Sequence, residues 1–305
     1  MNKKLMEMIS KRNSHDSKPL LDRYAADWQK NAEVDPFWAI LADPKFNNGK
    51  WNVAFFFATG DEEINRVFKF MEEKSIPLPA GSFLDFGCGV GRVSKTLRRR
   101  FQFGYGVDIA PKMIELARAY VDGVNFIINQ SDSLSQFNDN SIDFIYSNIA
   151  LQHIPNPYQQ KYIKEFLRIL RPGGLAVFQI PIELINPKDI KPNCTYFFKT
   201  TIKHWFPFLV RLKRRLSTKR EATPEFKIEM HILSQEIIEK ICEKAKCIIE
   251  CSVGTNSCDA DHDGKVEFHE LAEYRKELEN SQRINLYLSC MYFIHKRYID
   301  NRRLS

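Results

Sequence analysis

The sequence lacks any run of about 18 apolar residues, so a membrane-spanning helix is not expected. Residues 1–20 contain no apolar core of the kind that a secretory signal has, which favours a cytoplasmic protein. The seven cysteines form no CxxC pair and have no companion histidines at zinc-binding spacing, so we expect reduced thiols. Internal repeats and low-complexity tracts are also absent. What remains is the composition of an ordinary globular protein.

Positive charge is concentrated in one segment. Residues 188–220 contain ten Lys or Arg and one Asp, a local excess of +9, whereas the whole chain carries only +7. The rest of the chain is therefore slightly acidic. This distribution predicts a local anionic partner or an acidic membrane surface, and it argues against a protein built to coat nucleic acid.

Residues 1–80 have the pattern of aromatic-rich helices. Asp35 before Pro36 is typical of a helix N-cap followed by proline at the first helical position. Thr59 and Glu62 have the spacing of a capping box, which predicts a helix that begins there.

Short apolar segments alternate with amphipathic ones from residue 82 onward. Strands are expected at 82–86, 103–108, 124–129, 141–149, 173–181, 247–253 and 284–297, and helices at 92–101, 111–120, 157–170, 234–246 and 268–282. This alternation predicts a largely parallel sheet with helices on both faces.

A glycine-rich loop follows the first of these strands. In LDFGCGVGR, residues 84–92, Gly87, Gly89 and Gly91 separate an apolar strand from a helix. Glycines allow a tight turn and a close approach of the backbone to a ligand, and the helix offers free N–H groups. Arg92 breaks the GxGxxG dinucleotide fingerprint. Asp108 ends the second strand, where a carboxylate can accept hydrogen bonds from both hydroxyls of a ribose.

At these residues the chain resembles the class I S-adenosylmethionine-dependent methyltransferases. The matching pieces are LDFGCGVGR, GVDIAPKMIELAR, NQSDSL, SIDFIYSNIALQHI and LRPGGLAVF, which stand in the family's order. The resemblance covers roughly residues 80–182. It implies an α/β fold with a doubly wound, seven-stranded Rossmann-like sheet, an N-terminal helical cap and C-terminal insertions. Its sixth strand would lie near 247–253, and an antiparallel seventh near 284–296.

The resemblance also implies S-adenosylmethionine as the cofactor. The residues expected to contact it are Asp85, Gly87, Gly89, Gly91, Arg92, Asp108, Ile109, Asp132, Ser133 and Asn148. Asp85 either binds the methionine amino group or holds the glycine loop, and Asp132 either faces the adenine amino group or serves a turn. His153 is the candidate catalytic base for an acceptor hydroxyl or amine, or else it fixes its loop.

The acceptor is less well determined. The sequence has no [Asp/Asn/Ser]-Pro-Pro-[Tyr/Phe] or Pro-Cys motif, so DNA methylation is not expected and a small-molecule, saccharide or lipid acceptor remains, with a protein acceptor as the alternative. Residues 194–220 could form a lid over it, in which Arg211, Lys213, Arg214 and Arg215 face an anion or a membrane surface. Aromatic residues such as Trp28, Phe37, Trp38 and Trp51 cap the pocket or simply pack helices. We divide the chain into four parts. They are an N-terminal helical cap (1–80), an S-adenosylmethionine-binding core (81–182), a basic aromatic insertion (183–232) and the C-terminal part of the fold, which contains the EF-hand-like loop (233–305).

The stretch DADHDGKVEFHE, residues 259–270, matches the loop of an EF-hand. Its expected calcium ligands are Asp259, Asp261 and Asp263, the Lys265 carbonyl, Glu267 through water, and Glu270 with two oxygens, around a turn at Gly264 and an apolar anchor at Val266. A helix leading into the loop is missing. We predict a structural calcium at the sheet edge, away from the methyl-transfer chemistry. The alternatives are an acidic helix start, or a calcium-binding regulatory protein on a methyltransferase-like scaffold.

Overall fold

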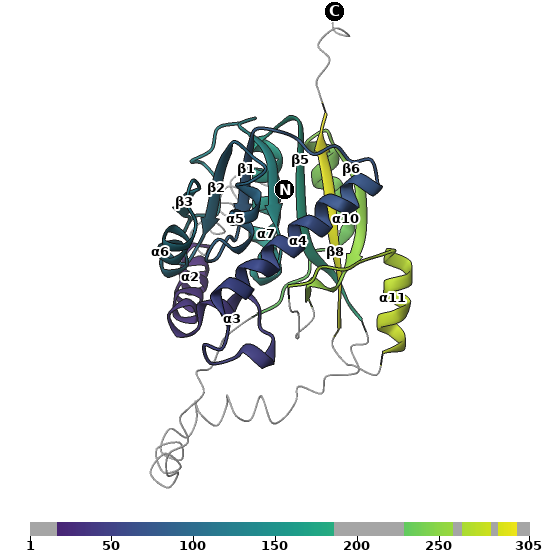
Figure 1. Ribbon diagram of the computed structural model, residues 1–305. Helices are drawn as coiled ribbons and strands as arrows, with labels where there is room; N and C mark the ends of the chain where they lie inside the picture. The colour runs from purple at the N-terminus through teal and green to yellow at the C-terminus, as the bar shows by residue number, and fades with distance from the viewer. Residues whose placement is uncertain (1–16, 186–228, 259–263, 282–285, 298–305) are drawn as a thin grey trace, which may run out of the picture.

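The computed structural model describes residues 17–185, 229–258, 264–281 and 286–297 (Figure 1). The basic segment, with its predicted lid, and Asp259, Asp261 and Asp263 lie outside these residues. The described residues form one sheet of eight strands in the order β3-β2-β1-β4-β5-β8-β6-β7. The strands are β1 (Ser82–Phe86), β2 (Phe103–Asp108), β3 (Asn125–Ile128), β4 (Ile142–Ser147), β5 (Leu170–Ile185), β6 (Cys247–Thr255), β7 (Phe268–His269) and β8 (Leu286–Lys296).

The sheet is mixed. Strands β1 to β5 pair in parallel, whereas β8 lies antiparallel between β5 and β6. The Rossmann-like methyltransferase topology is therefore present, but the described sheet has eight strands rather than seven. The additional strand is β7, in which Phe268 and His269 pair with Thr255 and Gly254 at the edge of the sheet.

Helices cover both faces of the sheet. They are α2 (Ser17–Val34), α3 (Pro36–Ile40), α4 (Val53–Glu73), α5 (Arg92–Leu97), α6 (Pro111–Tyr120), α7 (Asn156–Ile169), α10 (Gln235–Lys244) and α11 (Leu271–Asn280), with short 3-10 turns at Pro44–Phe46, Leu151–His153 and Asn256–Cys258. Figure 1 shows α4 crossing one face diagonally, with α7 and α10 behind the sheet. Apolar residues of α4 and α5 pack on one face, and those of α7 and α10 pack on the other.

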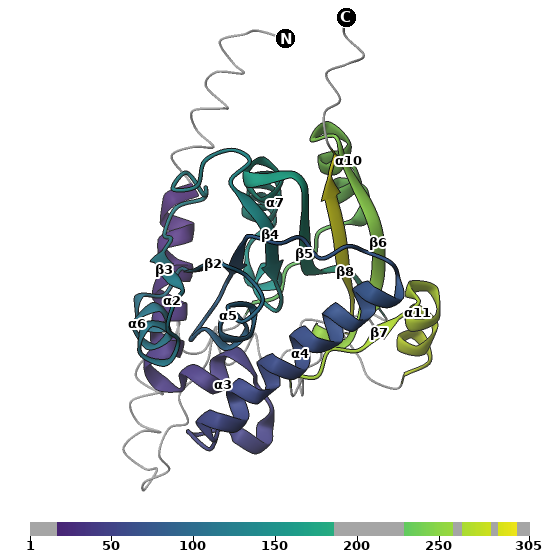
Figure 2. The same cartoon turned by 45° about the horizontal axis from the view of Figure 1, so that its top comes forward.

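Of the two helix starts predicted in the N-terminal region, one is confirmed and one is wrong. The Asp35 side chain accepts a hydrogen bond from the Trp38 backbone N–H at 3.2 Å, which confirms the predicted N-cap. The capping box at Thr59 is wrong, because α4 already begins at Val53 with Asn52 as its N-cap. The Thr59 hydroxyl instead donates to the Phe56 carbonyl within the helix, at 2.7 Å. In Figure 2, α2 and α3 lie beside α6, at the end of the sheet away from α11.

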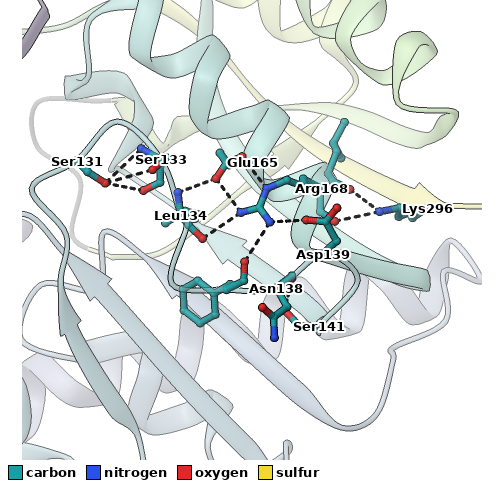
Figure 3. Close-up of polar contacts among 11 residues, drawn as sticks. Ser131, Ser133, Leu134, Asn138, Asp139, Ser141, Glu165, Arg168 and Lys296 are labelled. Atoms are coloured by element: carbon teal, nitrogen blue, oxygen red, sulfur yellow. Dashed lines mark hydrogen bonds and ion pairs between the residues drawn. The ribbon is translucent and has the colours of Figure 1, made fainter.

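An arginine of α7 organises the connection between β3 and β4, which contains no helix. The guanidinium of Arg168 binds both carboxylate oxygens of Glu165, at 2.7 and 2.8 Å, and donates to the carbonyls of Leu134 and Phe137, each at 3.0 Å (Figure 3). Asp139 accepts another of its hydrogen bonds at 2.6 Å. Three of these five charge-assisted contacts connect α7 to the loop that follows β3, and the other two hold the guanidinium against Glu165 of the same helix.

Within the described part of the chain, no helix is both long and apolar enough to cross a membrane. The cysteines whose side chains are described there, Cys88, Cys242, Cys247, Cys251 and Cys290, are free thiols.

Candidate active site

A pocket lies where the first four strands of the sheet end. Gly87 follows β1, Asp108 ends β2, Asn129 follows β3 and Asn148 follows β4, and all four line the pocket. Its atom-free space, open solvent included, is about 880 Å³. Ligands of open α/β sheets bind in this crevice, outside the carboxyl ends of the strands.

The glycine loop forms the floor of this pocket. Gly87 has φ +75°, and a Cβ atom there would lie 2.2 Å from the Cβ of Ala150, so only glycine fits. A Cβ atom at Gly89 would meet the Cδ1 atom of Ile40 at 2.5 Å. The end of α3 therefore covers the loop, and the cradle is shaped by both segments.

Asp108 is held in place by the backbone around it. Its carboxylate accepts hydrogen bonds from the N–H groups of Gly89 and Ala110, each at 2.9 Å. Burial raises the pKa of this carboxyl, and the two backbone N–H groups oppose the shift. The carboxylate is thus oriented at a strand end but retains acceptor capacity for a ligand.

Asn148 has a buried amide without a partner. Neither its Nδ2 nor its Oδ1 atom makes a hydrogen bond within the described residues, and both atoms are buried. A buried amide left unpaired costs roughly 1–3 kcal/mol. An unpaired donor and acceptor at the end of β4 therefore indicate a polar ligand in the pocket.

The next residue is strained. Ile149 also lines the pocket and has φ +60°, which is unusual for a β-branched residue. Its backbone N–H donates to the Gln179 side chain at 3.1 Å, and Gln179 in turn donates to Ser289 at 2.6 Å. Strain that is held by its surroundings is typical of functional sites.

The structure brings together only part of the predicted set. Gly87, Gly89, Asp108, Ile109, Asn148 and His153 line the pocket. Asp85, Gly91, Arg92, Asp132 and Ser133 are not among the lining residues. The Asp132 carboxylate pairs with the Nζ atom of Lys161 of α7.

Asp85 and Arg92 lie beneath the glycine loop in a buried polar network. Asp85 accepts a hydrogen bond from the Ser94 hydroxyl at 2.5 Å, and burial raises its pKa to about 7. Arg92 forms an ion pair with Glu63 of α4 at 2.6 Å, and Tyr146 donates to the same carboxylate at 2.8 Å. This arrangement favours the loop-holding role that was one of two expectations for Asp85.

His153 is buried, and both of its ring nitrogens have partners. Its Nδ1 atom lies 2.9 Å from the Glu229 carbonyl, so Nδ1 carries the proton. Its Nε2 atom lies 3.1 Å from the amide nitrogen of Gln152. Burial lowers the pKa of His153 to about 4, and the imidazole is neutral at pH 7. The contacts favour a loop-fixing role, and catalysis by His153 stays a prediction.

This burial has a consequence for stability. The pKa of His153 lies near 4 in the folded protein and near 6.5 when unfolded, so between these values the unfolded chain binds more protons. Stability is therefore retained above pH 6.5 and falls as the pH drops toward 4. Between pH 7 and pH 4, urea unfolding of wild type should lose about 3 kcal/mol more than that of His153→Gln. Equal losses would contradict the burial argument, and His295→Gln controls for the loss of any one histidine.

Several lining residues were not expected from the sequence. Asn129 could have been found by the rule that identified Asp108, because it also follows a strand end. Tyr24 and Ile40 come from the N-terminal helices, and no local pattern links them to the glycine loop. Of the aromatic residues proposed as a cap, Trp28 lines the pocket, whereas Trp51 packs against Phe56.

The described half of the calcium-like loop differs from an EF-hand. The helix expected at 268–282 begins only at Leu271, so Glu270 precedes the helix and Phe268 belongs to a strand. The Lys265 carbonyl accepts a hydrogen bond from Asn256 at 3.0 Å, and a Glu270 oxygen lies 3.9 Å from Lys74. Val266 is buried, as its anchor role requires. The described residues by themselves contain no group of three or more metal-ligating side chains.

The fold and the pocket agree with the resemblance to the class I S-adenosylmethionine-dependent methyltransferases that the sequence motifs indicated. Comparison with known families agrees, because residues 84–178 match the family model described as "Methyltransferase domain". The match begins in β1 and ends in β5, so it contains the glycine loop, Asp108, Asn148 and His153.

Two curated relatives illustrate the range of similar proteins. Trans-aconitate 2-methyltransferase from Enterobacter sp. (strain 638) is 26% identical over 46% of this chain and 54% of its own length. The 2-methyl-6-phytyl-1,4-hydroquinone methyltransferase from Synechocystis sp. (strain PCC 6803) is 32% identical over 32% of this chain and 31% of its own length. The chain thus spans about half or less of these relatives.

Among solved structures, a SAM-dependent methyltransferase from Leishmania major is 12% identical. The superposition covers 90% of this chain and 82% of that chain, with a TM-score of 0.49.

Proposed function

We propose that this protein transfers a methyl group from S-adenosylmethionine to the oxygen or nitrogen of a small-molecule acceptor. The observation that carries the proposal is the pairing, in one pocket, of a strand-end carboxylate at Asp108 with the unpaired amide of Asn148. A nucleoside cofactor with a charged amino acid end has hydroxyls for the first group and polar atoms for the second.

The residues of the pocket fit such a cofactor. Asp108 would accept hydrogen bonds from the ribose hydroxyls, and the Gly87 and Gly89 backbone would approach the methionine portion. Ile109 and Asn129 would border the adenine, while Asp132 and Ser133 stay predictions for that end. Asn148 would bind near the sulfonium, whose bound methyl group is already activated for transfer.

The protein's own contribution is then mainly positioning. Holding the acceptor in line with the methyl group supplies much of the rate increase. An acceptor hydroxyl or amine must also lose its proton, which requires a base or a proton path in the pocket. The two named relatives act on small molecules according to their names, one of them on a ring with a long hydrocarbon chain, and this supports a small-molecule acceptor over a saccharide or a protein.

Calorimetry with S-adenosylmethionine and with S-adenosylhomocysteine tests the proposal. We expect both to bind, and Gly87→Val to abolish binding because its side chain would collide with Ala150. Gly49→Val is the matched control, since a Cβ at that glycine meets nothing within 4 Å and the φ is similarly positive at +70°. The cofactor assignment would be refuted if Gly87→Val bound as well as Gly49→Val does, or if wild type bound neither compound.

We further propose that the loop at residues 259–270 binds a structural calcium ion. The support is its sequence pattern and the burial of Val266. Calcium at millimolar concentration should raise the melting temperature, because a cation would relieve the repulsion among the four carboxylates that this sequence pattern assigns to one loop. Asp259→Asn together with Glu270→Gln should remove that rise and leave cofactor binding intact. An unchanged melting temperature of wild type in calcium would reject the site, and magnesium serves as the control ion.

A further inference from the structure

A cluster of titratable side chains lies at one end of the pocket, outside the glycine loop. Tyr24 of α2 lines the pocket and is 8% exposed. Its hydroxyl donates a hydrogen bond to a carboxylate oxygen of Glu229, because a carboxylate can only accept. The Nε2 atom of His231 lies 3.0 Å from the same hydroxyl and can donate to it. The Tyr24 oxygen is thus held from two sides.

The segment that carries Glu229 and His231 is itself fixed. The His231 backbone N–H donates to the Gln152 carbonyl at 2.7 Å, and the Glu229 carbonyl accepts from His153. The Leu233 N–H donates to the Pro181 carbonyl at 3.0 Å. These three hydrogen bonds hold the segment that places Glu229 and His231 against Tyr24.

The lining of the pocket is short of positive charge. Among the described lining residues there is no Lys or Arg, and Asp108 carries a negative charge. Around Tyr24 the lining consists of apolar and aromatic side chains, including Leu21 and Trp28. Beside Tyr24, the Glu229 carboxylate pairs with the Arg23 guanidinium at 3.4 Å, so this pair adds little net charge to the site. This chemistry suits a neutral ring that carries a hydroxyl better than it suits an anionic acceptor.

We infer that Tyr24 takes the proton of a neutral, ring-bearing hydroxyl acceptor and passes its own proton to Glu229. The inference rests on the proposed function. The acceptor oxygen forms a bond to the methyl carbon as the carbon–sulfur bond breaks, and the electron pair of that bond stays on sulfur. The acceptor proton moves to the Tyr24 oxygen, while the Tyr24 proton moves to the Glu229 carboxylate. One proton and one methyl group are thus accounted for.

The raised pKa of Tyr24 is consistent with this path. Burial and the hydrogen bond to Glu229 raise its pKa to about 12, so the phenol is protonated at neutral pH. A permanently charged tyrosinate is therefore excluded as the base, and a concerted exchange of protons removes the need for one.

Two probes with the same naphthalene ring, one neutral and one anionic, test the acceptor class. Protein saturated with S-adenosylhomocysteine is titrated with 2-naphthol and with 2-naphthoate, followed by calorimetry. We expect naphthol to bind at least about 10-fold more tightly, and Tyr24→Phe to weaken naphthol about 2-fold to 10-fold through one lost hydrogen bond. Tyr120→Phe, an exposed tyrosine, is the matched control. Equal or tighter binding of naphthoate, or no binding of either up to 1 mM, would overturn the acceptor class.

Methyl transfer from labelled S-adenosylmethionine to 2-naphthol tests the proton path. Tyr24→Phe should lower kcat by about 10²-fold to 10⁴-fold. Glu229→Gln keeps an acceptor for the Tyr24 hydroxyl but takes up protons poorly, so kcat should fall with KM nearly unchanged. Normal kcat in both variants, or naphthol that binds without being methylated, would overturn the path. Failure of S-adenosylhomocysteine to bind would instead overturn the proposed function, so the two failures are distinguishable.

Discussion

Replacing Glu63 by Ala should lower the free energy of unfolding by roughly 3–5 kcal/mol. The Glu63 side chain is 0% exposed, its ion-pair partner Arg92 is 5% exposed, and 2.6 Å separates their charged atoms. The substitution leaves a buried guanidinium without its counter-charge. It also removes the acceptor of the Tyr146 hydroxyl, which is buried as well. In the folded variant, the Arg92 guanidinium and the Tyr146 hydroxyl would both be buried without a partner, and burial of an unpaired polar group is costly.

Urea unfolding at pH 7.5 measures this effect, with a control on the same helix. Glu73 lies 3.8 Å from Lys69, but both side chains are exposed, so Glu73→Ala should cost less than about 1 kcal/mol. Glu63→Gln retains an acceptor for Tyr146, so its loss in the free energy of unfolding should lie between those of Glu63→Ala and Glu73→Ala. A loss below about 1 kcal/mol for Glu63→Ala would show that water or a rearranged partner satisfies Arg92.

The second large effect concerns the cofactor. Asp108→Ala should weaken S-adenosylhomocysteine at least about 10-fold, since each hydrogen bond to a charged group is worth roughly 1.5–3 kcal/mol. The fold should survive the change. Burial raises the pKa of Asp108, so the folded protein disfavours its charge, and removing that charge opposes the loss of the hydrogen bonds from the Gly89 and Ala110 N–H groups.

Calorimetry and thermal unfolding, done on the same samples, separate binding from folding. Asp108→Asn retains one carbonyl oxygen and should weaken binding less than Ala does. Asp122→Ala, an exposed acid in the turn before β3, is the control and should bind normally. Unchanged affinity in Asp108→Ala would place the ribose elsewhere. A melting temperature that falls by more than about 10 °C would show that Asp108 mainly orders the Gly89 loop.

The regular part of the fold was predictable because its residues specify it locally. Strands at 82–86 and 103–108 were expected at the bounds that they have, since Gly81 and Gly87 flank the first run, and the second lies between the polar Gln102 and the charged Asp108. The predicted capping box at Thr59 was wrong because a threonine three residues before an acidic residue also occurs inside helices. The strand β7 was not expected, because Phe268 and His269 become a strand only through pairing with β6, which no local pattern encodes.

The candidate site also has a part that the sequence predicts and a part that it does not. Asp108 and Asn148 could be predicted because a polar residue at the end of a buried parallel strand points to a crevice. The Tyr24 hydroxyl and the His231 ring lie within 3.0 Å of each other but are 207 positions apart in the chain. Such a contact depends on how whole elements pack, and one sequence contains no signal for it.

The position of Tyr24, Trp28 and His231 outside residues 84–178 has a consequence for the acceptor. The half of the pocket that is expected to hold the cofactor lies within the segment that matches the family model, whereas the proposed acceptor wall is built by chain segments on either side of it. Under the proposed function, substitutions in that wall would change the acceptor without touching the matched half. The relatives' names therefore support a small-molecule acceptor but do not identify it.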